Sequence, residues 1–133
     1  MVYENEMMIN TWEQFGRNAG RIWQTLHKYN TLSKVQLLEK TQLRPYEIDI
    51  SVGWLARENK IACESDTYRI SETNLTPIIG TNAGVVWETL HRHGESDITL
   101  LNKETGLHKN EIYEAIGWLA REDKLNFSTK QGD

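Results

Sequence analysis

The stretch GWLARENK at residues 53–60 decides the organisation of this chain, because it returns as GWLAREDK at residues 117–124. Upstream, GRNAGRIWQTLH at residues 16–27 returns as GTNAGVVWETLH at residues 80–91, at the same offset of about 64. Between residues 16 and 61, about 20 of roughly 46 positions are identical. The chain is therefore a tandem duplication. Two copies are too few for a solenoid, in which three or more repeats stack.

Working outward from this motif, the first copy contains three helical segments. Residues 18–29 place Ala19, Ile22 and Leu26 on one helical stripe. A second helix begins at Ser33 with the capping-box pattern Ser33…Gln36 and ends at Thr41. After a break at 42–44, Pro45 starts a third helix with an apolar inward stripe that includes Ile48, Val52, Leu55 and Ala56. Residues 61–64 and 67–70, around Ser65-Asp66, predict a β-hairpin.

The second copy repeats this order with small changes. Thr76 followed by Pro77 predicts a helix N-cap, and Asp97 is the expected cap of the next helix. The third helix has the matching stripe Ile112, Ile116, Leu119 and Ala120. The sequence ends at Asp133, so Ile70 has no counterpart. We therefore expect the second hairpin to be shortened or completed differently.

This order of elements resembles the winged helix-turn-helix fold, and the turn Thr105-Gly106-Leu107 is its most typical element. In copy one, Gln42 replaces the turn glycine. More narrowly, the GxNAG…W and GWLARE motifs resemble a small prokaryotic winged-helix family of unknown function, over residues 12–72 and 76–131. The resemblance implies a mainly α fold with small β-hairpin wings, that is, a three-helix bundle plus wing, twice. We expect an N-terminal tail at 1–11, copy one at 12–72, a short linker near 72–75 and copy two at 76–133.

Composition indicates a globular protein. The chain has 133 residues, of which 26% are charged and 38% hydrophobic. No apolar run approaches the roughly 18 residues that span a bilayer. Residues 1–9 carry Glu4 and Glu6 and no basic residue, unlike a signal peptide. Cys63 is the single cysteine, which fits a reducing compartment. These features predict a cytoplasmic protein with no membrane partner.

The charge is lower than a dedicated nucleic-acid binder usually has, since such affinity comes largely from neutralising phosphates. The net charge is −4 and the pI about 5.6. Residues 12–72 hold 9 Lys/Arg against 8 Asp/Glu, whereas residues 73–133 hold 6 against 9. Copy one is thus near neutral and copy two acidic, which indicates that the two copies have diverged in role.

The resemblance implies that the third helix would read DNA. Its outward face is expected to carry Tyr46, Asp49, Ile50, Gly53 and Arg57 in copy one, and the counterparts Asn110, Tyr113, Glu114, Gly117 and Arg121 in copy two. Asp49 and Glu114 would face phosphates unfavourably. A basic stripe on the first helix could track a phosphate backbone. The candidate DNA contacts are Arg17, Arg21, Lys28, Arg44, Tyr46, His108, Lys109, Asn110 and Tyr113.

Other features favour contact with protein. Val85 stands where copy one has Arg21, which indicates that this face is covered by copy one or another chain. The candidate interaction residues are Ile50, Val85, Trp54 and Trp118, the two tryptophans lying at the base of the wing or at a seam between the copies. The glycine pairs of GxNAG indicate close helix packing. Each Arg-Glu of GWLARE is expected to form a local structural ion pair.

No catalytic constellation emerges. His27, His91, His93 and His108 are scattered, and one cysteine cannot supply a zinc cluster of the usual spacing. Cys63 has no neighbouring histidine to activate it, so we interpret it as a small strand residue. We expect no enzyme activity, no metal and no cofactor.

Two functions remain open. The chain could be a regulator of the transcription-factor type that binds double-stranded DNA through the third helix and wing. Alternatively, it could be a protein-interaction module that scaffolds a complex or a homodimer. The fold resemblance favours the first, and the acidic pI with Asp49, Ile50 and Val85 favours the second. Fold alone does not decide between them. We predict DNA binding, the function that the family resemblance implies, with the interaction module as the alternative.

Overall fold

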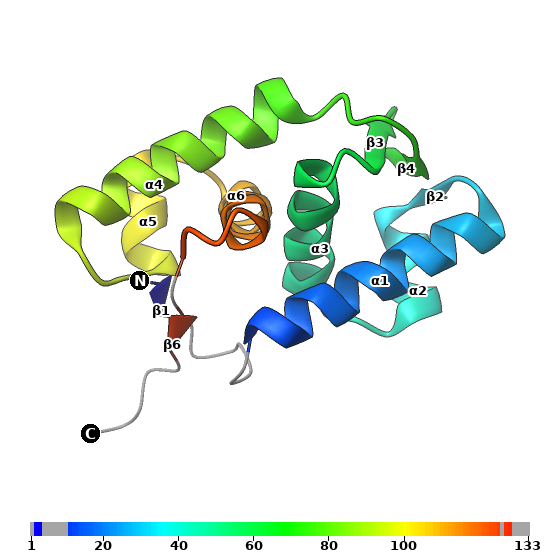
Figure 1. Cartoon of the computed structure of the whole chain (residues 1–133), viewed down its shortest axis with the longest axis horizontal. Coiled ribbons are helices and arrows are strands. Elements are labelled where there is room, and N and C mark those ends of the chain that lie inside the picture. The colour runs from blue at the N-terminus through cyan, green and yellow to red at the C-terminus, as the bar shows by residue number, and fades with distance from the viewer. Residues whose placement is uncertain (1, 4–10, 126, 129–133) are drawn as a thin grey trace.

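The computed structural model describes residues 2–3, 11–125 and 127–128, and these residues form two winged-helix copies that face each other (Figure 1). Copy one comprises α1 (Thr11–Tyr29), β2 (Leu32–Ser33), α2 (Lys34–Thr41), α3 (Pro45–Arg57), β3 (Ile61–Glu64) and β4 (Thr67–Ile70). Copy two comprises η1 (Thr76–Gly80), α4 (Thr81–His93), β5 (Ser96–Asp97), α5 (Ile98–Thr105), α6 (Lys109–Arg121) and β6 (Phe127–Ser128). A short strand, β1 (Val2–Tyr3), precedes both copies. The expected fold class, mainly helical with small wings, is confirmed.

Local capping signals determine where the second helices begin. The Ser33 hydroxyl accepts from the Gln36 amide at 3.2 Å, and the Gln36 side chain accepts from the Ser33 amide at 2.8 Å. The Asp97 carboxylate accepts from the Leu100 amide at 2.8 Å. Each contact satisfies a backbone donor that has no partner within its helix. Both predicted caps are confirmed.

The turns after α2 and α5 need a left-handed residue. Gly106 has φ 74° and Gln42 has φ 61° at the equivalent place. Glycine adopts this conformation readily, whereas a side chain costs about 1–2 kcal/mol. The Gln42 side-chain amide donates to the Glu39 carbonyl at 2.8 Å, which supports the turn without glycine.

Two helix starts differ from expectation. The first helix begins at Thr11, earlier than the predicted start at residue 18. Thr76 is not an N-cap, because it already lies inside η1, and the Leu75 carbonyl accepts from the amides of Ile78 and Ile79 at 3.1 and 2.7 Å. η1 continues directly into α4, so Pro77 occupies the first turn of one long helical segment.

The wing of copy two is completed by the start of the chain. In copy one, β4 lies between β2 and β3 and is antiparallel to both. In copy two, β1 lies between β5 and β6 and is parallel to both. Val2–Tyr3 therefore takes the central place that β4 holds in copy one, with the opposite strand direction. Figure 1 shows β1 beside β6. Part of the expected N-terminal tail is a strand that ties the chain's beginning to its second copy.

The two copies share their cores. One cluster of buried side chains is formed mainly by α4, α5 and α6 of copy two, yet it includes Phe15, Tyr46 and Ile50 of copy one. The half-buried rings of Trp54 and Trp118 pack against this cluster and against the copy-one cluster as well. Apolar burial, the main driving force of folding, thus links the copies as closely as it links helices within each copy.

The link between the copies is the crossing of α3 and α6. These helices pack against each other as the third helices of the two copies, and the contact follows the pseudo-twofold relation of the repeat (Figure 1). A Cβ at Gly53 would overlap the carbonyl of Glu114, and a Cβ at Gly117 would overlap the carbonyl of Ile50. The repeated glycine of GWLARE is therefore what lets the two backbones touch.

We expect Gly53→Ala to destabilise the chain by about 2–4 kcal/mol, because a methyl group at this position has to push two helix backbones apart. Gly20→Ala is the matched control: Gly20 is an exposed glycine inside α1, and nothing lies within 4 Å of its added Cβ. That variant should be more stable by about 0.5–1 kcal/mol. Urea unfolding of both variants measures the difference. Equal small effects would contradict the close crossing.

Candidate functional site

The end of the GWLARE motif crosses the seam between the copies. Arg57 Nε donates to Glu122 Oε2 at 3.0 Å, and Arg121 Nε donates to Glu58 Oε2 at 2.9 Å. The predicted pairing of each arginine with the glutamate that follows it is therefore wrong. Adjacent residues on a helix do not face each other, whereas the symmetric crossing brings each arginine to the opposite copy's glutamate.

The two tryptophans lie at this seam, as one of the sequence interpretations has it. The Trp54 ring lies 3.5 Å from an added Cβ at Gly16, and the Trp118 ring lies 3.3 Å from one at Gly80. The other copy's arginine covers each ring: Arg121 lies 5.7 Å from the Trp54 centroid, and Arg57 lies 5.8 Å from that of Trp118. The first glycine of GxNAG thus leaves room for the tryptophan that supports the seam.

Much of the predicted outward face of the third helix is buried, although Arg57, Asn110 and Arg121 are exposed. Tyr46 is 9% exposed and Tyr113 8%, and their rings lie 5.4 Å apart across the seam. Ile50 is 1% exposed and Asp49 4%. The orientation expected from the sequence was wrong here because each third helix packs on its own copy with one face and on the other copy with the opposite face. Tyr46 and Tyr113, two candidate DNA contacts, are core residues of the pair.

The carboxylates of Asp49 on α3 and Glu114 on α6 form the polar part of this face and interact electrostatically. Asp49 Oδ1 forms an ion pair with Lys34 Nζ at 2.7 Å. Burial raises the pKa of Asp49, and Lys34 opposes the rise. Burial, and then the charge of Asp49, raise the pKa of Glu114 to about 7 from its ordinary 4.5, while Lys34 again opposes. The Lys34 ammonium group thus forms an ion pair with Asp49, and its charge also opposes the rise in the pKa of Glu114 from the other copy.

The wing of copy one borders the same cluster. Burial and the nearby charge of Glu114 raise the pKa of Tyr68, on β4. Burial, with the charges of Asp66 and Glu114, raises the pKa of the Cys63 thiol, on β3. A raised thiol pKa keeps the sulfur protonated, which is the opposite of what an activated nucleophile needs. The geometry agrees with the interpretation of Cys63 as a small strand residue.

The remaining candidate residues are dispersed over the surface. Arg17 and Lys28 are exposed on α1, Arg44 precedes α3, and His108, Lys109 and Asn110 are exposed at the start of α6. The amides of Arg44 and His108 are capped by Glu47 and Glu111, at 2.8 and 2.9 Å. The structure does not gather these residues with Tyr46 and Tyr113 into one surface.

Arg21 and its counterpart Val85 show how the outer faces diverge. The Arg21 guanidinium donates to the backbone carbonyl of Thr41, at the C-terminal end of α2, where a positive charge is favourable. Val85 is 39% exposed and lies on a face with Ile78, which is 56% exposed. Copy one does not cover Val85. The helix face that carries Arg17, Arg21 and Lys28 in copy one carries Thr81, the exposed Val85 and Arg92 in copy two.

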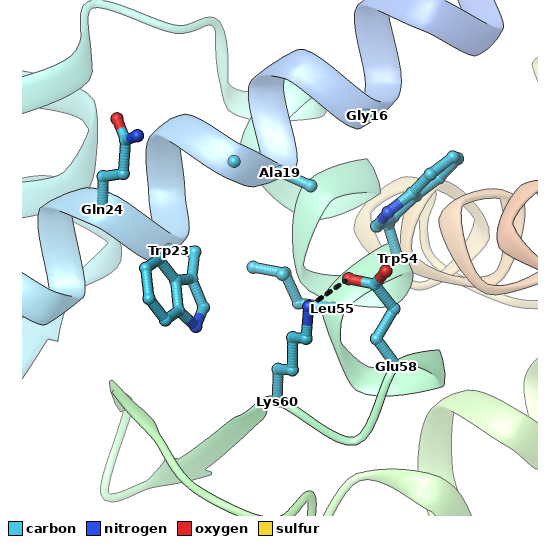
Figure 2. A pocket seen from close by; sticks show the side chains of 9 residues that line it. Gly16, Ala19, Trp23, Gln24, Trp54, Leu55, Glu58 and Lys60 are labelled. Atoms are coloured by element: carbon cyan, nitrogen blue, oxygen red, sulfur yellow. Dashed lines mark ion pairs between the residues drawn. The ribbon is translucent and has the colours of Figure 1, made fainter.

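A pocket of about 440 Å³ lies beside the seam in copy one (Figure 2). The indoles of Trp23 and Trp54 form walls from α1 and α3, and Lys60 Nζ reaches Glu58 Oε1 at 3.7 Å between them (Figure 2). Its lining draws on both repeated motifs: Gly16, Ala19, Gly20, Trp23, Gln24, Trp54, Leu55, Glu58 and Lys60. The Glu58 carboxylate at this pocket forms ion pairs with Arg121 and Lys60, so the charged groups of the lining are paired.

Within the described residues, no group of three or more His, Cys, Asp or Glu side chains could hold a metal ion. No helix among them is long and apolar enough to cross a membrane.

Replacing Glu114 should change how stability depends on pH. Because the folded chain binds this proton more tightly than the unfolded chain, the stability present below pH 4.5 is lost as pH rises towards 7. Glu114→Gln removes this titration. Between pH 5 and pH 8 the parent should therefore lose on the order of 1–3 kcal/mol of folding stability that the variant keeps. Urea unfolding from pH 4 to 8 measures this. Exposed Glu88→Gln is the control, and parallel curves for parent and Glu114→Gln would contradict the assignment.

The comparisons with known proteins identify the family. The winged helix-turn-helix domain (DUF2582) matches the chain twice, over residues 8–75 and 71–133. Searches of curated proteins and of solved structures found no match. Together the two matches cover nearly the whole chain, in agreement with the internal repeat and with the fold described above. The chain belongs to the winged helix-turn-helix domain (DUF2582) family and carries two copies of that domain in tandem.

Proposed function

We propose that this chain is a non-enzymatic protein-interaction module, in which two winged helices form one packed unit and present their outer faces to a partner. The observation that carries the proposal is the α3–α6 crossing at Gly53 and Gly117. This crossing occupies the helices that DNA-binding winged-helix proteins insert into the major groove.

The burial of the third helices argues against groove reading by this pair. A helix that reads base edges needs free polar side chains along its outward face. Here that face carries Tyr46, Ile50 and Tyr113, each less than 10% exposed, and the carboxylates Asp49 and Glu114. Separating α3 from α6 would expose this apolar surface and break two arginine–glutamate pairs. Binding to DNA would first have to offset that cost.

The outer face of copy two is the surface best suited to a protein partner. Ile78 and Val85, seven residues apart along η1 and α4, are 56% and 39% exposed. Trp87, 40% exposed, lies two residues from Val85 and so on a different face, where it stacks on His91. A contiguous exposed apolar patch is the mark of a protein-interaction site, and we take Ile78 and Val85 as its residues here. The partner is either another protein or a second copy of this chain.

Self-association through this face gives a direct test. We expect light scattering after size exclusion to show a dimer, and Val85→Arg, which installs the residue of copy one, to weaken it at least tenfold. Thr99→Arg, an exposed substitution on α5, is the matched control for added charge. A chain that is monomeric at every concentration and purifies without a partner would count against the interaction module.

Binding to duplex DNA is the second candidate, favoured by the exposed basic side chains Arg17 and Lys28 on α1. Contacts of this kind neutralise phosphates without reading sequence. If this function operates, Arg17→Ala should lower affinity for all duplexes alike and reduce the salt slope by about 1. Changes at Lys109 or Asn110 would alter sequence preference only if α6 reads bases.

The variant Tyr113→Ala tests whether α6 reads bases, and a salt titration of random duplex binding tests whether DNA is bound at all.

We expect Tyr113→Ala to lower the folding stability by about 2–4 kcal/mol and to leave sequence preference unchanged, since this ring packs in the seam. A specific loss of one DNA sequence at unchanged stability would restore the groove-reading hypothesis. No binding near 50 mM salt, or binding without a salt slope, would exclude the DNA function.

A further inference from the structure

We infer that copy one carries an oxyanion site for a phosphate group, where the C-terminal half of α1 meets the C-terminal end of α2. Lys28 contributes from α1 and Lys40 from α2, around the ring of Tyr29, and Arg21 adds a positive charge at the C-terminal end of α2. This inference is independent of the interaction surface on copy two, and it requires no movement of α3 or α6.

Two of the three cations lie at one aromatic ring, and the third lies at the end of α2 that follows Lys40. Lys40 Nζ lies 4.0 Å from the centroid of the Tyr29 ring, and Lys28 Nζ lies 5.2 Å from it. Arg21 donates to the carbonyl of Thr41, the residue after Lys40. The two ammonium groups are therefore closer together than the Debye length of about 10 Å at 0.1 M salt, so solvent ions screen their repulsion only in part.

A pocket of about 320 Å³ opens beside Lys28 and Lys40. It is lined by Gln24, Thr25, Lys28, Tyr29 and Lys40, of which the lysines offer ammonium donors, Gln24 an amide donor and Tyr29 a hydroxyl donor. The Thr25 hydroxyl donates to the Arg21 carbonyl at 2.7 Å and keeps only acceptor capacity. No carboxylate lines it; Glu39, which precedes Lys40, is not among the lining residues. Within the described part of the chain, no acidic side chain lies within 4.0 Å of either lysine nitrogen.

Copy two shows what the same place looks like without this charge. The equivalents of Arg21, Lys28 and Lys40 are Val85, Arg92 and Glu104. Glu104 lies 3.7 Å from Nε2 of His93, which stands where copy one has Tyr29. One copy therefore gathers three positive charges, and the other has one positive and one negative charge beside a valine. The common fold does not require the charged version.

The chemistry of the cluster fits a phosphate. The C-terminal ends of α1 and α2 favour nearby cations, but a helix end carries only about half a charge and cannot neutralise three. A phosphate brings up to two negative charges and several acceptor oxygens, which lysine meets as a point charge from either side. The phosphate could belong to a small molecule or to a nucleic-acid backbone, and the pocket recognises the group that both share.

Inorganic phosphate is the first probe. At constant ionic strength, set with chloride, we expect saturable amide shifts in two-dimensional NMR at Thr25, Lys28, Tyr29 and Lys40. Lys40→Glu, which installs the residue of copy two, should weaken phosphate binding at least tenfold. Arg92→Gln, in the corresponding region of copy two, should leave the affinity unchanged, and circular dichroism checks that each variant folds.

A short random duplex is the second probe and distinguishes the sources of the phosphate. Shifts at the same four residues with the duplex, reversed by excess phosphate, would assign the site to a nucleic-acid backbone; shifts with phosphate alone would assign it to a small ligand. The inference is overturned if neither probe gives saturable shifts there, or if Lys40→Glu binds as the parent does. A response to poly-glutamate without one to phosphate would also overturn it.

Discussion

The close approach of two backbones, where Gly53 meets the carbonyl of Glu114 and Gly117 meets that of Ile50, is the constraint on which the rest of this structure depends. Because neither glycine carries a Cβ, α3 and α6 can cross at backbone contact. That crossing carries Arg57 to Glu122 and Arg121 to Glu58. It also places Phe15, Tyr46 and Ile50 in the core of the other copy. The tandem domains are consequently one packed unit.

Much of the fold could be predicted from the sequence because its signals are local. The capping box at Ser33, the cap at Asp97, Pro45 at a helix start and the turn at Ser65-Asp66 each specify backbone geometry within a few residues. The parallel strand of Val2–Tyr3 could not be predicted, since two residues have no periodicity. Its partners β5 and β6 lie far along the chain, so only the folded pair brings them together.

The candidate site was harder to predict for a related reason. A helical wheel separates Ile48 and Val52 from Asp49 and Ile50, but it cannot show what covers the second face. A mixture of Tyr, Asp and Ile suits a groove-reading surface as well as a seam with a polar patch. The repetition of Gly53 at Gly117 was one signal, because an interior helix glycine that costs about 1 kcal/mol needs a packing reason. The outward Ile50 and the repeated tryptophans, Trp54 and Trp118, were others. The repeated glycine indicates a close helix contact, but the sequence does not show that the contacting helix is the third helix of the other copy.

The residues that are identical in the two copies and the residues that differ therefore lie in different parts of the structure. The positions that stay identical, in GxNAG and GWLARE, include the glycines, tryptophans, arginines and glutamates that hold the seam together. The outer faces of α1 and α4 are free of that constraint, and there the copies differ in kind: Arg21 against Val85, and Lys40 of α2 against Glu104 of α5. A pair joined so tightly keeps the seam face of its third helices buried while it stays closed. The copies differ instead on their outer faces: copy one is basic there, and copy two carries the exposed Val85 beside Arg92 and Glu104.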